Sequence, residues 1–565
     1  MYKTSQAEKN NPVSNETDTT VYDVAIIGGG INGTGIARDC SLRGLKVALF
    51  EKNDLSSGAT GACTGMIHGG ARYLLNDIHT THLSSLDSGY IQKIAPHLLF
   101  RIPFVTPVLK QDFMPKVYIE LLETFFEAYD KFAPLKNSKP HTKLTKEELK
   151  ALEPGITDDA IGAISFDEFG IDTFRLCTEN ALSAAEHGAG IHNHTEVKQL
   201  LTEGKEVKGV RVKDTFSGET RDVHARIVMN AAGPWLPGVA GLAGTTVKIR
   251  PGKGIHLILD RRAANIGIVI KAIDGRQVFM MPHDNTFIIG TTDDDYYGDL
   301  NNLWATHDEI EYLLQAAEHY FPRIREYRIM RVMVGVRPTL YAWGKNEDAL
   351  YREHRIVDHE AEDGVKGFLT IAGGKLASYR LMSEEATDVI CKKLGCKSTC
   401  KTHTEPLPGG HFIPDVKKLA QQYGLDPYVV SRISYRHGSK TEEILKLTQD
   451  EPSNGNIVCE CEPVIEAEIR YAIRNEWART IPDLRRRTRL GTGSCQGRRC
   501  TVRAAYILGE ELGLDADGIK KMIQGFIKER WKGKAPILTD KQLAEEELNL
   551  STHILSDSLN VIIEK

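Results

Sequence analysis

The first part of the chain has the hydrophobic pattern of a parallel α/β unit. The apolar run at 21–27 ends at glycines and predicts a buried strand. A helical stretch over about 32–43 follows, and a second apolar run at 46–50 predicts another strand that ends at Glu51. This strand–helix–strand order predicts a parallel sheet covered by helices.

Further along, the periodicity changes to that of an amphipathic helix and then to that of short strands. Apolar residues recur at steps of three and four over 111–132, and the opposite face is mostly acidic. Interfacial membrane helices carry Lys or Arg on that face, so we predict that this helix packs on the protein or on a partner. Residues 207–300 contain short β-rich runs and a turn at 283–286, which predict a β-rich domain.

Local signals mark the ends of several later segments. Thr145 and Glu148 have the spacing of a capping box at the start of a short helix. A buried strand at 367–372 leads through a glycine pair into another helix. Residues 396–414 are rich in Lys, Thr, Pro and Gly and predict a linker, after which the chain continues mainly as helices.

Composition narrows the class of protein. With 565 residues the chain is long enough for about three or four domains. Its 41% apolar and 26% charged residues are those of a folded globular protein. The net charge of −5 gives no basic field, so we expect no nucleic-acid partner. No apolar run is long enough to span a bilayer, and residues 1–20 have the composition of a flexible tail, so we expect a cytoplasmic protein.

The glycines after the first strand form a dinucleotide-binding signature. Gly28, Gly30 and Gly33 have the G-x-G-x-x-G spacing, which lets backbone approach a pyrophosphate at a helix N-terminus. Glu51 follows at the distance where an acid accepts hydrogen bonds from ribose hydroxyls. The motif alone does not separate NAD from FAD. The small residues at 54–62 favour a permanently held flavin, and the later glycine pair would aim a helix N-terminus at its ring.

Four of the ten cysteines form a late cluster, with Cys459 and Cys461 followed by Cys495 and Cys500. Four soft ligands in two pairs suit either a 2Fe-2S cluster or a structural zinc. Zinc sites usually use C-x2-C, so the C-x-C pair favours iron–sulfur. The arginines at 485–489 predict a solvated helix face, with stabilisation of a reduced cluster or docking of an acidic partner as the alternative.

Six segments taken together are similar to one family. They are GGGINGTGIARD at 28–39, MIHGGARYL at 66–74, AAGPW at 231–235, GTTD at 290–293, GVRP at 335–338 and GGKLASYR at 373–380. The set resembles the FAD-dependent glycerol-3-phosphate dehydrogenases, and the late cysteines resemble those of the catalytic subunit of the anaerobic, multi-subunit members. Residues 478–500 are similar to a 2Fe-2S domain of the bacterioferritin-associated-ferredoxin type.

The resemblance implies oxidation of sn-glycerol 3-phosphate to dihydroxyacetone phosphate, with hydride passing to FAD and electrons passing through the cluster to partner subunits or a quinone. It also allows peripheral association with the cytoplasmic face of the inner membrane. A phosphomonoester carries nearly two negative charges and needs several cations. The implied substrate residues are Arg72, Tyr73, Arg337 and Lys375. Histidine is a usual general base, so His68 and His256 are the candidates for removing the C2 hydroxyl proton, and an arginine–flavin pair that stabilises the alkoxide is the alternative to both. The expected flavin residues are Gly28, Gly30, Gly33, Glu51, Ser57, Gly58, Thr60, Gly233, Gly373 and Gly374.

We therefore expect an α/β fold. It combines a three-layer, Rossmann-like FAD-binding domain of the D-amino-acid-oxidase type with an interleaved antiparallel-β substrate domain and a helical C-terminal region that holds the small cluster domain. The expected boundaries are a tail at 1–20, an oxidoreductase domain at 21–395 (FAD segments at about 21–105, 165–245 and 345–395, substrate segments at about 106–164 and 246–344), a linker and helical segment at 396–452, the cluster domain at 453–505 and a helical segment at 506–565. The rival functions are a glycerol-3-phosphate oxidase that uses oxygen, an FAD enzyme acting on a 2-hydroxy acid or an amine, and a redox sensor without enzymatic activity.

Overall fold

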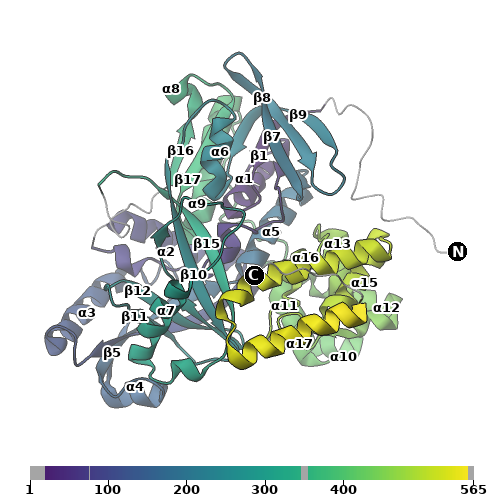
Figure 1. Cartoon of the computed structure of the whole chain (residues 1–565). Coiled ribbons are helices and arrows are strands. Elements are labelled where there is room, and N and C mark those ends of the chain that lie inside the picture. The colour runs from purple at the N-terminus through teal and green to yellow at the C-terminus, as the bar shows by residue number, and fades with distance from the viewer. Residues whose placement is uncertain (1–19, 76, 345–353, 558–565) are drawn as a thin grey trace.

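The computed structural model describes residues 20–75, 77–344 and 354–557, so the tail expected at 1–20 lies almost wholly outside the described residues. Two β-sheets lie next to each other, and a helical region packs beside them (Figure 1). The chain contributes strands to the sheets in turn, so segments far apart in sequence meet in each sheet.

The first sheet is built around the strand predicted at 21–27. Within the described residues, its strands follow the order β16-β17-β9-β1-β2-β6, in which β16 alone is antiparallel to its neighbour. β7 and β8 extend one end of β9 as an antiparallel meander. The strands are β1 (Val21–Ile27), β2 (Val47–Phe50), β6 (Gly190–His192), β7 (Thr195–Glu203), β8 (Glu206–Asp214), β9 (Thr220–Asn230), β16 (His354–Asp358) and β17 (Phe368–Gly373).

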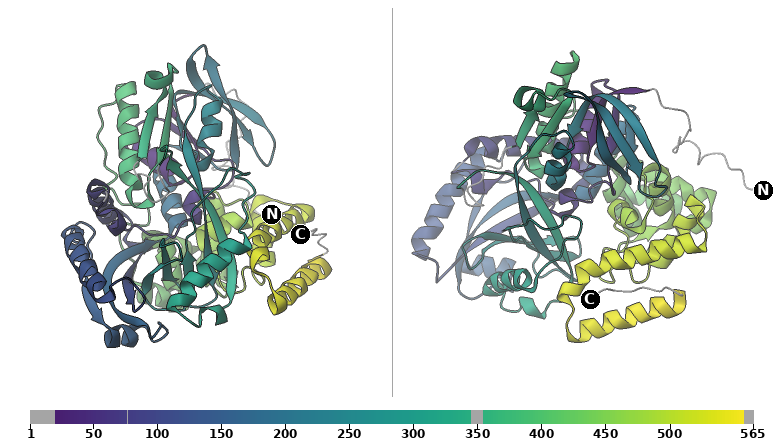
Figure 2. Two further views of the ribbon diagram at one scale, coloured as in Figure 1. Left: turned by 60° about the vertical axis from the view of Figure 1, so that its left-hand side comes forward. Right: turned by 45° about the horizontal axis from the view of Figure 1, so that its top comes forward.

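This sheet is the middle of three layers. Helices α1 (Ile31–Leu42), α5 (Thr173–Glu186) and α9 (Tyr379–Leu394) cover one face and share an apolar core with it (Figure 2). The β7–β8–β9 meander covers the other face. Because both faces are covered, central strands such as β2 are buried at every position, as the continuous apolar runs predict.

The second sheet is mostly antiparallel. Within the described part of the chain its order is β14-β10-β13-β12-β11-β3-β5-β4, and β15 pairs with β10 along most of its length. The strands are β3 (Leu99–Leu109), β4 (Thr142–Thr145), β5 (Ala160–Ile171), β10 (Ile249–Leu259), β11 (Gly267–Lys271), β12 (Gln277–His283), β13 (Thr286–Gly290), β14 (Asp294–Asp295) and β15 (Ile329–Leu340).

Helices pack on both faces of the second sheet. α7 (His307–Tyr320) shares one core with it, and α3 (Pro115–Tyr129) shares the core on the opposite face. The amphipathic helix predicted at 111–132 is thereby confirmed as α3. It begins at Pro115, a position where a helix does not need the missing N–H. The other helices of this part are α2 (Ile78–Ile94), α4 (Lys146–Leu152), α6 (Leu236–Gly241) and α8 (His359–Asp363), and α4 begins at the predicted capping box.

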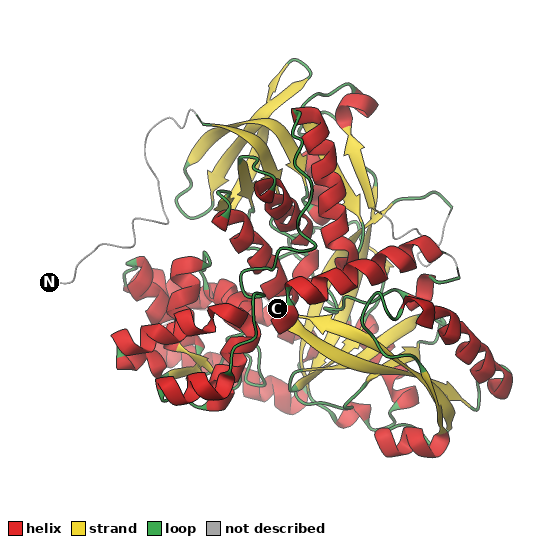
Figure 3. Cartoon of the chain, turned by 180° about the vertical axis from the view of Figure 1, so that it is seen from behind, coloured by secondary structure: helices red, strands yellow, loops and turns green. Residues whose placement is uncertain are grey.

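The C-terminal part of the chain is a cluster of helices against the two sheets (Figure 3). Two apolar cores hold it together, and the second contains Cys459 and Cys500. No helix in the described ranges has the length and apolarity needed to cross a membrane. The elements are α10 (Val416–Tyr423), α11 (Pro427–His437), α12 (Thr441–Asp450), β18 (Ile457–Cys459), β19 (Val464–Ile465), α13 (Glu466–Asn475), α14 (Ile481–Thr488), α15 (Thr501–Leu512), α16 (Ala516–Lys534) and α17 (Asp540–Asp557).

The segment at 396–414 contains no helix or strand, but it is fixed to the first sheet's helices. The buried Arg38 of α1 donates hydrogen bonds to the carbonyls of Thr402 at 3.3 Å and Glu405 at 2.5 Å. Leu407 is fully buried. The predicted linker is therefore packed against the protein, because its backbone carbonyls accept hydrogen bonds from a buried arginine. The expected α/β fold with its interleaved β-rich part and helical C-terminal region is confirmed.

Candidate active site

The predicted nucleotide-binding turn lies between β1 and α1. Gly28 has a φ of 112°, and a Cβ there would lie 2.6 Å from the carbonyl oxygen of Ala231. A Cβ at Gly33 would lie 1.9 Å from the carbonyl oxygen of Gly28. Gly30 is the N-cap of α1. The turn is therefore as tight as glycine allows, and it presents a helix N-terminus, which attracts anions such as a pyrophosphate.

Two side chains hold this turn. Glu51, directly after β2, accepts hydrogen bonds from the N–H groups of Gly29 at 2.7 Å and Asn53 at 2.8 Å. Thr60 accepts one from the N–H of Ile31 at 3.0 Å. Burial raises the pKa of Glu51, and the two backbone donors oppose that rise. Glu51 and Thr60 thus both lie at the glycine turn.

The loop at 54–64 runs from this turn to the second sheet. Its Ser57 donates its N–H to a carbonyl three residues earlier at 3.1 Å. A Cβ at Gly58 would lie 3.3 Å from the ring of Trp235. Gly233, with a φ of 55°, begins the short turn that carries this tryptophan. The structure therefore brings Gly58 close to the segment around Gly233.

A cavity of about 340 Å³ lies between the 54–64 loop and the second sheet. Gly254 and Gly335 stand opposite each other on β10 and β15. A Cβ at Gly335 would lie 2.5 Å from the Cβ of Ala62, so this glycine lets the loop rest on the sheet. The cavity is lined by Ala59, Ala62, Cys63, Thr64, Gly254, His256, Gly335, Val336 and Arg337.

His256 is a buried member of this cavity. Its Nε2 lies 3.0 Å from the hydroxyl of Thr64, and its Nδ1 is buried with no hydrogen-bond partner among the described residues. Burial, with a further contribution from the positive charge of Arg337, lowers the pKa of His256 to about 3. The imidazole is therefore neutral at neutral pH and can accept a proton.

Arg337 is oriented by the GTTD segment. Its Nη1 lies 3.0 Å from the carboxylate of Asp293, and its Nη2 donates to the hydroxyl of Thr291 at 3.0 Å. Arg250 pairs with the same carboxylate at 2.8 Å. The Arg337 side chain remains 31% exposed. Sequence reasoning missed the roles of Asp293 and Thr291, although the segment that contains them was among the family-like motifs.

A second group of predicted residues meets around Gly70. Lys375 Nζ lies 4.0 Å from the centre of the Tyr73 ring and donates to the hydroxyl of Ser84 at 2.9 Å. Gly70 has a φ of 79°, and a Cβ there would lie 2.8 Å from the Tyr73 ring. The backbone of Arg72 belongs to the same turn, while its side chain lies outside what the structure describes.

β17 turns toward α9 at the predicted glycine pair. Gly373 and Gly374 have φ values of 79° and 87°. A Cβ at Gly374 would lie 2.3 Å from the sulfur of Met382 in α9. A larger residue would therefore displace the flexible end of Met382 and would also be strained by the left-handed φ of this turn.

His68, the other predicted base, lines a different cavity. This cavity has a volume of about 780 Å³ and lies between the second sheet and α3, with mostly apolar and aromatic walls. Glu168 also lines it, accepts a hydrogen bond from Tyr129 at 2.7 Å and pairs with Lys136 at 2.9 Å. The structure thus places His68 and His256 in separate surroundings.

The four late cysteines meet at one edge of the helical region. Cys459 and Cys500 lie close enough to influence each other's pKa, and so do Cys461 and Cys495. Cys459 and Cys500 are buried, whereas Cys461 and Cys495 are half-buried. A Cβ at Gly493 would lie 2.4 Å from that of Cys461, so glycine is needed where the two loops meet. The cysteines are therefore arranged as one buried pair and one more accessible pair.

The solvated helix face predicted at 485–489 is wrong. Arg487 is fully buried and forms an ion pair with Asp54 at 2.7 Å. Arg486 pairs with the same carboxylate at 2.7 Å. Burial lowers the pKa of Arg485 to about 9. The cations are buried because Asp54, from the loop after Glu51, lies against this helix and compensates two of them.

Other ion pairs join the helical region to both sheets. Arg489 pairs with Asp284 in the β12–β13 turn at 3.1 Å and with Asp172, the N-cap of α5, at 3.5 Å. Arg175 of α5 pairs with Glu476 at 2.7 Å, and both side chains are buried. The helical region is therefore attached to the first sheet and the second sheet by buried charges.

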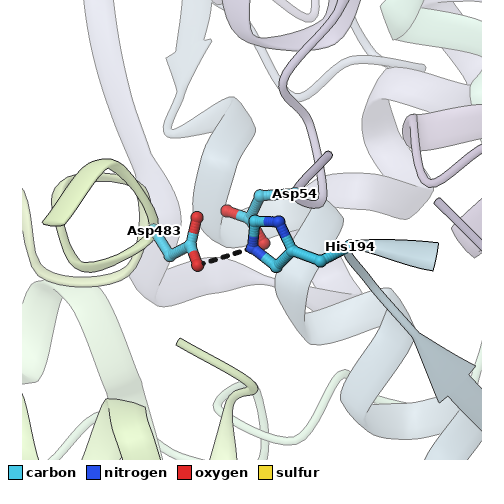
Figure 4. Close-up of side chains that lie close together, drawn as sticks. All are labelled: Asp54, His194 and Asp483. Atoms are coloured by element: carbon cyan, nitrogen blue, oxygen red, sulfur yellow. Dashed lines mark hydrogen bonds and ion pairs between the residues drawn. The ribbon is translucent and has the colours of Figure 1, made fainter. Parts of the chain in front are cut away.

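His194 lies between Asp54 and Asp483, as Figure 4 shows. One ligand atom from each lies within 4.8 Å of the other two, the spacing of a metal site. His194 Nε2 is 2.9 Å from Asp483, and both oxygens of Asp54 accept from Arg487 at 2.7 and 2.8 Å. Because arginine already neutralises Asp54, we interpret this group as a contact between regions and not as a metal centre.

Comparison with known proteins gives the family. Residues 23–380 match the model of the FAD dependent oxidoreductases, and residues 400–519 match the C-terminal domain of alpha-glycerophosphate oxidase. The chain is 36% identical over 538 residues to one subunit of the anaerobic glycerol-3-phosphate dehydrogenase of Escherichia coli, and the match covers 94% of this chain and 96% of that protein. The chain belongs to the FAD-dependent glycerol-3-phosphate dehydrogenase family.

Two further matches agree with this family membership. The aerobic glycerol-3-phosphate dehydrogenase of Staphylococcus epidermidis is 30% identical over 493 residues, covering 83% of this chain and 86% of that one. The solved structure of the glycerol-3-phosphate dehydrogenase of Bacillus halodurans complexed with FAD aligns with a TM-score of 0.73 at 22% identity, over 93% of this chain and 97% of that one. The second match shows that the fold is shared over almost the whole chain.

Proposed function

We propose that this family member oxidises sn-glycerol 3-phosphate to dihydroxyacetone phosphate and uses FAD as the hydride acceptor. The observation that carries this proposal is the cavity beside the 54–64 loop, in which the neutral His256 and the cationic Arg337 lie together. A base and a cation at one cavity suit a substrate that must lose a hydroxyl proton and carries a phosphate.

The residues of the glycine turn fit FAD. Gly28 and Gly33 leave no room for side chains, so the backbone at the N-terminus of α1 is open to a pyrophosphate. Glu51 is oriented by two backbone donors and retains acceptor capacity for ribose hydroxyls. When bound, FAD supplies the acceptor for the hydride that leaves the substrate. We propose that Ser57, Gly58, Thr60, Gly233, Gly373 and Gly374 complete its binding site.

We propose that cations bind the phosphate of the substrate. Arg337 is held by Asp293 and Thr291, which fixes the direction of its guanidinium. Lys375 and Tyr73 lie together beside Gly70, in the turn that also contains Arg72. A fixed guanidinium binds a phosphate with two parallel hydrogen bonds, and a lysine adds a point charge.

We propose His256 as the base that takes the C2 hydroxyl proton. One feature supports it over His68: it shares a cavity with Arg337, whereas His68 lines the other cavity. A pKa of about 3 makes a weak base. Burial is the main cause of this low pKa, and a phosphate dianion close to Arg337 would offset only the smaller contribution, which comes from the arginine charge.

We propose that Cys459, Cys461, Cys495 and Cys500 bind a 2Fe-2S cluster. Their arrangement in two pairs supports two metal ions, each with two thiolates. A single tetrahedral zinc would bring all four sulfurs to about 3.8 Å of one another. Among the described residues, no three of these sulfurs lie within 4.8 Å of each other. Anaerobically purified protein should contain about two irons per chain, and zinc at about one per chain would contradict the cluster.

We propose that electrons leave through this cluster to partner subunits or to a quinone, on the cytoplasmic side of the inner membrane. The half-buried pair Cys461 and Cys495 supports this route, because an acceptor can approach the more exposed edge. The relative from Escherichia coli is named as one subunit of its enzyme, which supports a multi-subunit assembly here. Anaerobic reduction of the full chain by substrate should be followed by reoxidation with a short-chain quinone or with a partner, and failure of both would contradict the route.

The decisive experiment is an anaerobic titration of the FAD-loaded protein with sn-glycerol 3-phosphate. The flavin absorption band should bleach first and the cluster spectrum should follow. Failure of glycerol 3-phosphate to bleach the flavin, together with bleaching by a 2-hydroxy acid or an amine, would overturn the proposed substrate. The match of residues 400–519 to an oxidase domain keeps the oxidase as the second candidate. Stoichiometric hydrogen peroxide during aerobic turnover would favour that candidate.

A further inference from the structure

The C-terminal end of α9 carries two cysteines that its capping turn brings together. Gly395 ends the helix in the left-handed conformation, with a φ of 74°. The N–H of Cys396 then donates to the carbonyl of Cys391 at 2.9 Å. In helix ends of this type, the side chain before the cap and the side chain after it come into contact. In most proteins that contact is apolar, but here both positions are cysteine.

The two thiols are in contact and unoxidised. The backbone bond between Cys396 and Cys391 holds the two residues side by side, and both cysteines are free. Cys391 is buried, whereas Cys396 is half-buried and open to a small molecule. Cys400, the next cysteine along the chain, is hydrogen-bonded to Thr402 at 3.1 Å instead. The pair is thus distinct both from Cys400 and from the four late cysteines.

We propose that Cys391 and Cys396 form a redox-active dithiol that small-molecule disulfides oxidise to an intramolecular disulfide. In the first step the Cys396 thiolate attacks one sulfur of the disulfide RSSR and releases RS⁻. In the second step the Cys391 thiolate attacks the Cys396 sulfur and releases the other RS⁻. The two thiol protons end on the two RS⁻ groups, so that RSSR is reduced to two RSH while the protein gains one S–S bond.

The surroundings of the two sulfurs give the order of these steps. A hydrogen bond from the backbone of Ser398 lowers the pKa of Cys396, and burial raises the pKa of Cys391 to about 12. The charged group that faces both thiols is Arg43, at the end of α1, which is itself held by Asp39 and Asp388. Cys396 is therefore the attacking thiol, and closure by Cys391 is the slower step.

The dithiol lies where the ends of α1 and α9 meet, and both helices lead back to the glycine turns. The Cys396 thiol lies 3.8 Å from the carbonyl of Arg43, and Arg43 pairs with Asp388 of α9 at 2.5 Å. The opposite end of α1 begins at Gly30, and the chain enters α9 from the turn that follows Gly374. Oxidation would remove the thiol proton that Cys396 donates to Arg43, at the far end of the helix pair whose near ends carry both glycine-rich turns.

The test uses full-length, FAD-loaded protein incubated with oxidised glutathione, alkylated and digested with trypsin. Trypsin cuts between the two cysteines at Lys392 and Lys393, so an internal disulfide links peptide 381–392 to peptide 394–397. We expect this linked pair to appear, to grow with the ratio of oxidised to reduced glutathione, and to separate on reduction. Cys400→Ser is the matched control and should leave the linked pair unchanged.

Single variants separate the two steps. Cys391→Ser should accumulate glutathione on Cys396, and Cys396→Ser should prevent reaction at both positions. The proposal is overturned by a stable glutathione adduct on Cys396 of the unaltered chain without the linked peptides. It is equally overturned by linkage of either cysteine to Cys400, or by no reaction at any glutathione ratio.

Discussion

Asp54 and Asp293 are each held by two arginines, and we propose opposite roles for them. Asp54 pairs with Arg486 and Arg487, which both belong to α14 of the helical region. Asp293 pairs with Arg250 and Arg337, from neighbouring strands of the second sheet. The chemistry of the two groups is the same, so their different roles must come from their surroundings.

Exposure is what separates the two groups. The side chains of Arg487 and Asp54 are 0% exposed, so the two charges neutralise each other inside the fold and do not reach solvent. The Arg337 side chain is 31% exposed and lines a cavity, while Arg250 stays buried behind it. We therefore propose that the buried pair attaches the helical region, whereas the half-buried pair orients the Arg337 cation toward a ligand.

The largest effect is expected from Asp54→Ala. It leaves the fully buried Arg487 without a carboxylate partner and leaves Arg486 with Asp483 alone, which should lower stability by about 3–5 kcal/mol. Thermal unfolding and limited proteolysis near residue 396 measure the loss. Asp23→Ala is the matched control, since Asp23 pairs with the exposed Arg226 and should cost no more than about 1 kcal/mol. Equal losses in the two variants would contradict the attachment role.

Arg337→Ala should weaken substrate binding without unfolding the protein, because Asp293 keeps Arg250. Loss of a charged hydrogen bond of about 1.5–3 kcal/mol should raise the KM for glycerol 3-phosphate by roughly 10- to 100-fold. The KM for glycerol, which has no phosphate, should change far less. Steady-state kinetics with both substrates decides, and an equal rise for both would remove Arg337 from phosphate binding.

Apolar replacement of each pair should sharpen the contrast. Asp54→Leu combined with Arg487→Met should recover most of the stability lost in Asp54→Ala, because apolar residues of similar volume replace buried ion pairs well. Arg486 keeps Asp483 as a partner at 3.3 Å. Asp293→Leu combined with Arg337→Met should stay folded with a high KM. The proposed difference between the two groups would be contradicted if the first double variant regained stability and the second regained a low KM. It would also be contradicted if neither variant regained its property.

The smallest effect is a difference in pH dependence. The pKa of His256 is lowered from 6.5 to about 3, so between these values the unfolded chain binds a proton that the folded chain does not, and stability falls as pH falls. Arginine charges lower the pKa of Asp54 below 3.8, so its contribution is lost only in stronger acid. His256→Gln should make the midpoint of denaturation depend less on pH between pH 6.5 and 4. His224→Gln, at an exposed position, should leave that pH dependence unchanged. Parallel curves for the His256 variant and the unaltered protein would contradict this assignment.

Local signals in the sequence predicted local structure well. The strand at 21–27, the glycine turn after it and the capping box at Thr145 all depend on residues close together in the chain, and all are confirmed. The same holds for the amphipathic helix α3, whose apolar side needs only a neighbouring sheet. Periodicity and spacing are sufficient where the interacting residues are neighbours in sequence.

Contacts between residues far apart in the chain could not be predicted from periodicity and spacing. The arginines at 485–489 looked solvated because Asp54, which neutralises Arg486, lies 432 residues earlier. His68 and His256 could not be ranked, since a sequence does not say which histidine shares a cavity with Arg337. The closeness of Cys391 and Cys396 could have been predicted from the sequence, because the glycine before Cys396 already marks a helix end.

Asp54 stands three residues after Glu51 and three before Ser57, and its charge is balanced by a helix from the far end of the chain. A protein truncated before α10 would therefore keep the strands of the two large sheets. It would still lose Arg486 and Arg487, the arginines that neutralise Asp54 at the start of the 54–64 loop. The helical region is thus not a detachable module, and exchanging it between relatives would require carrying the aspartate and its arginines across together.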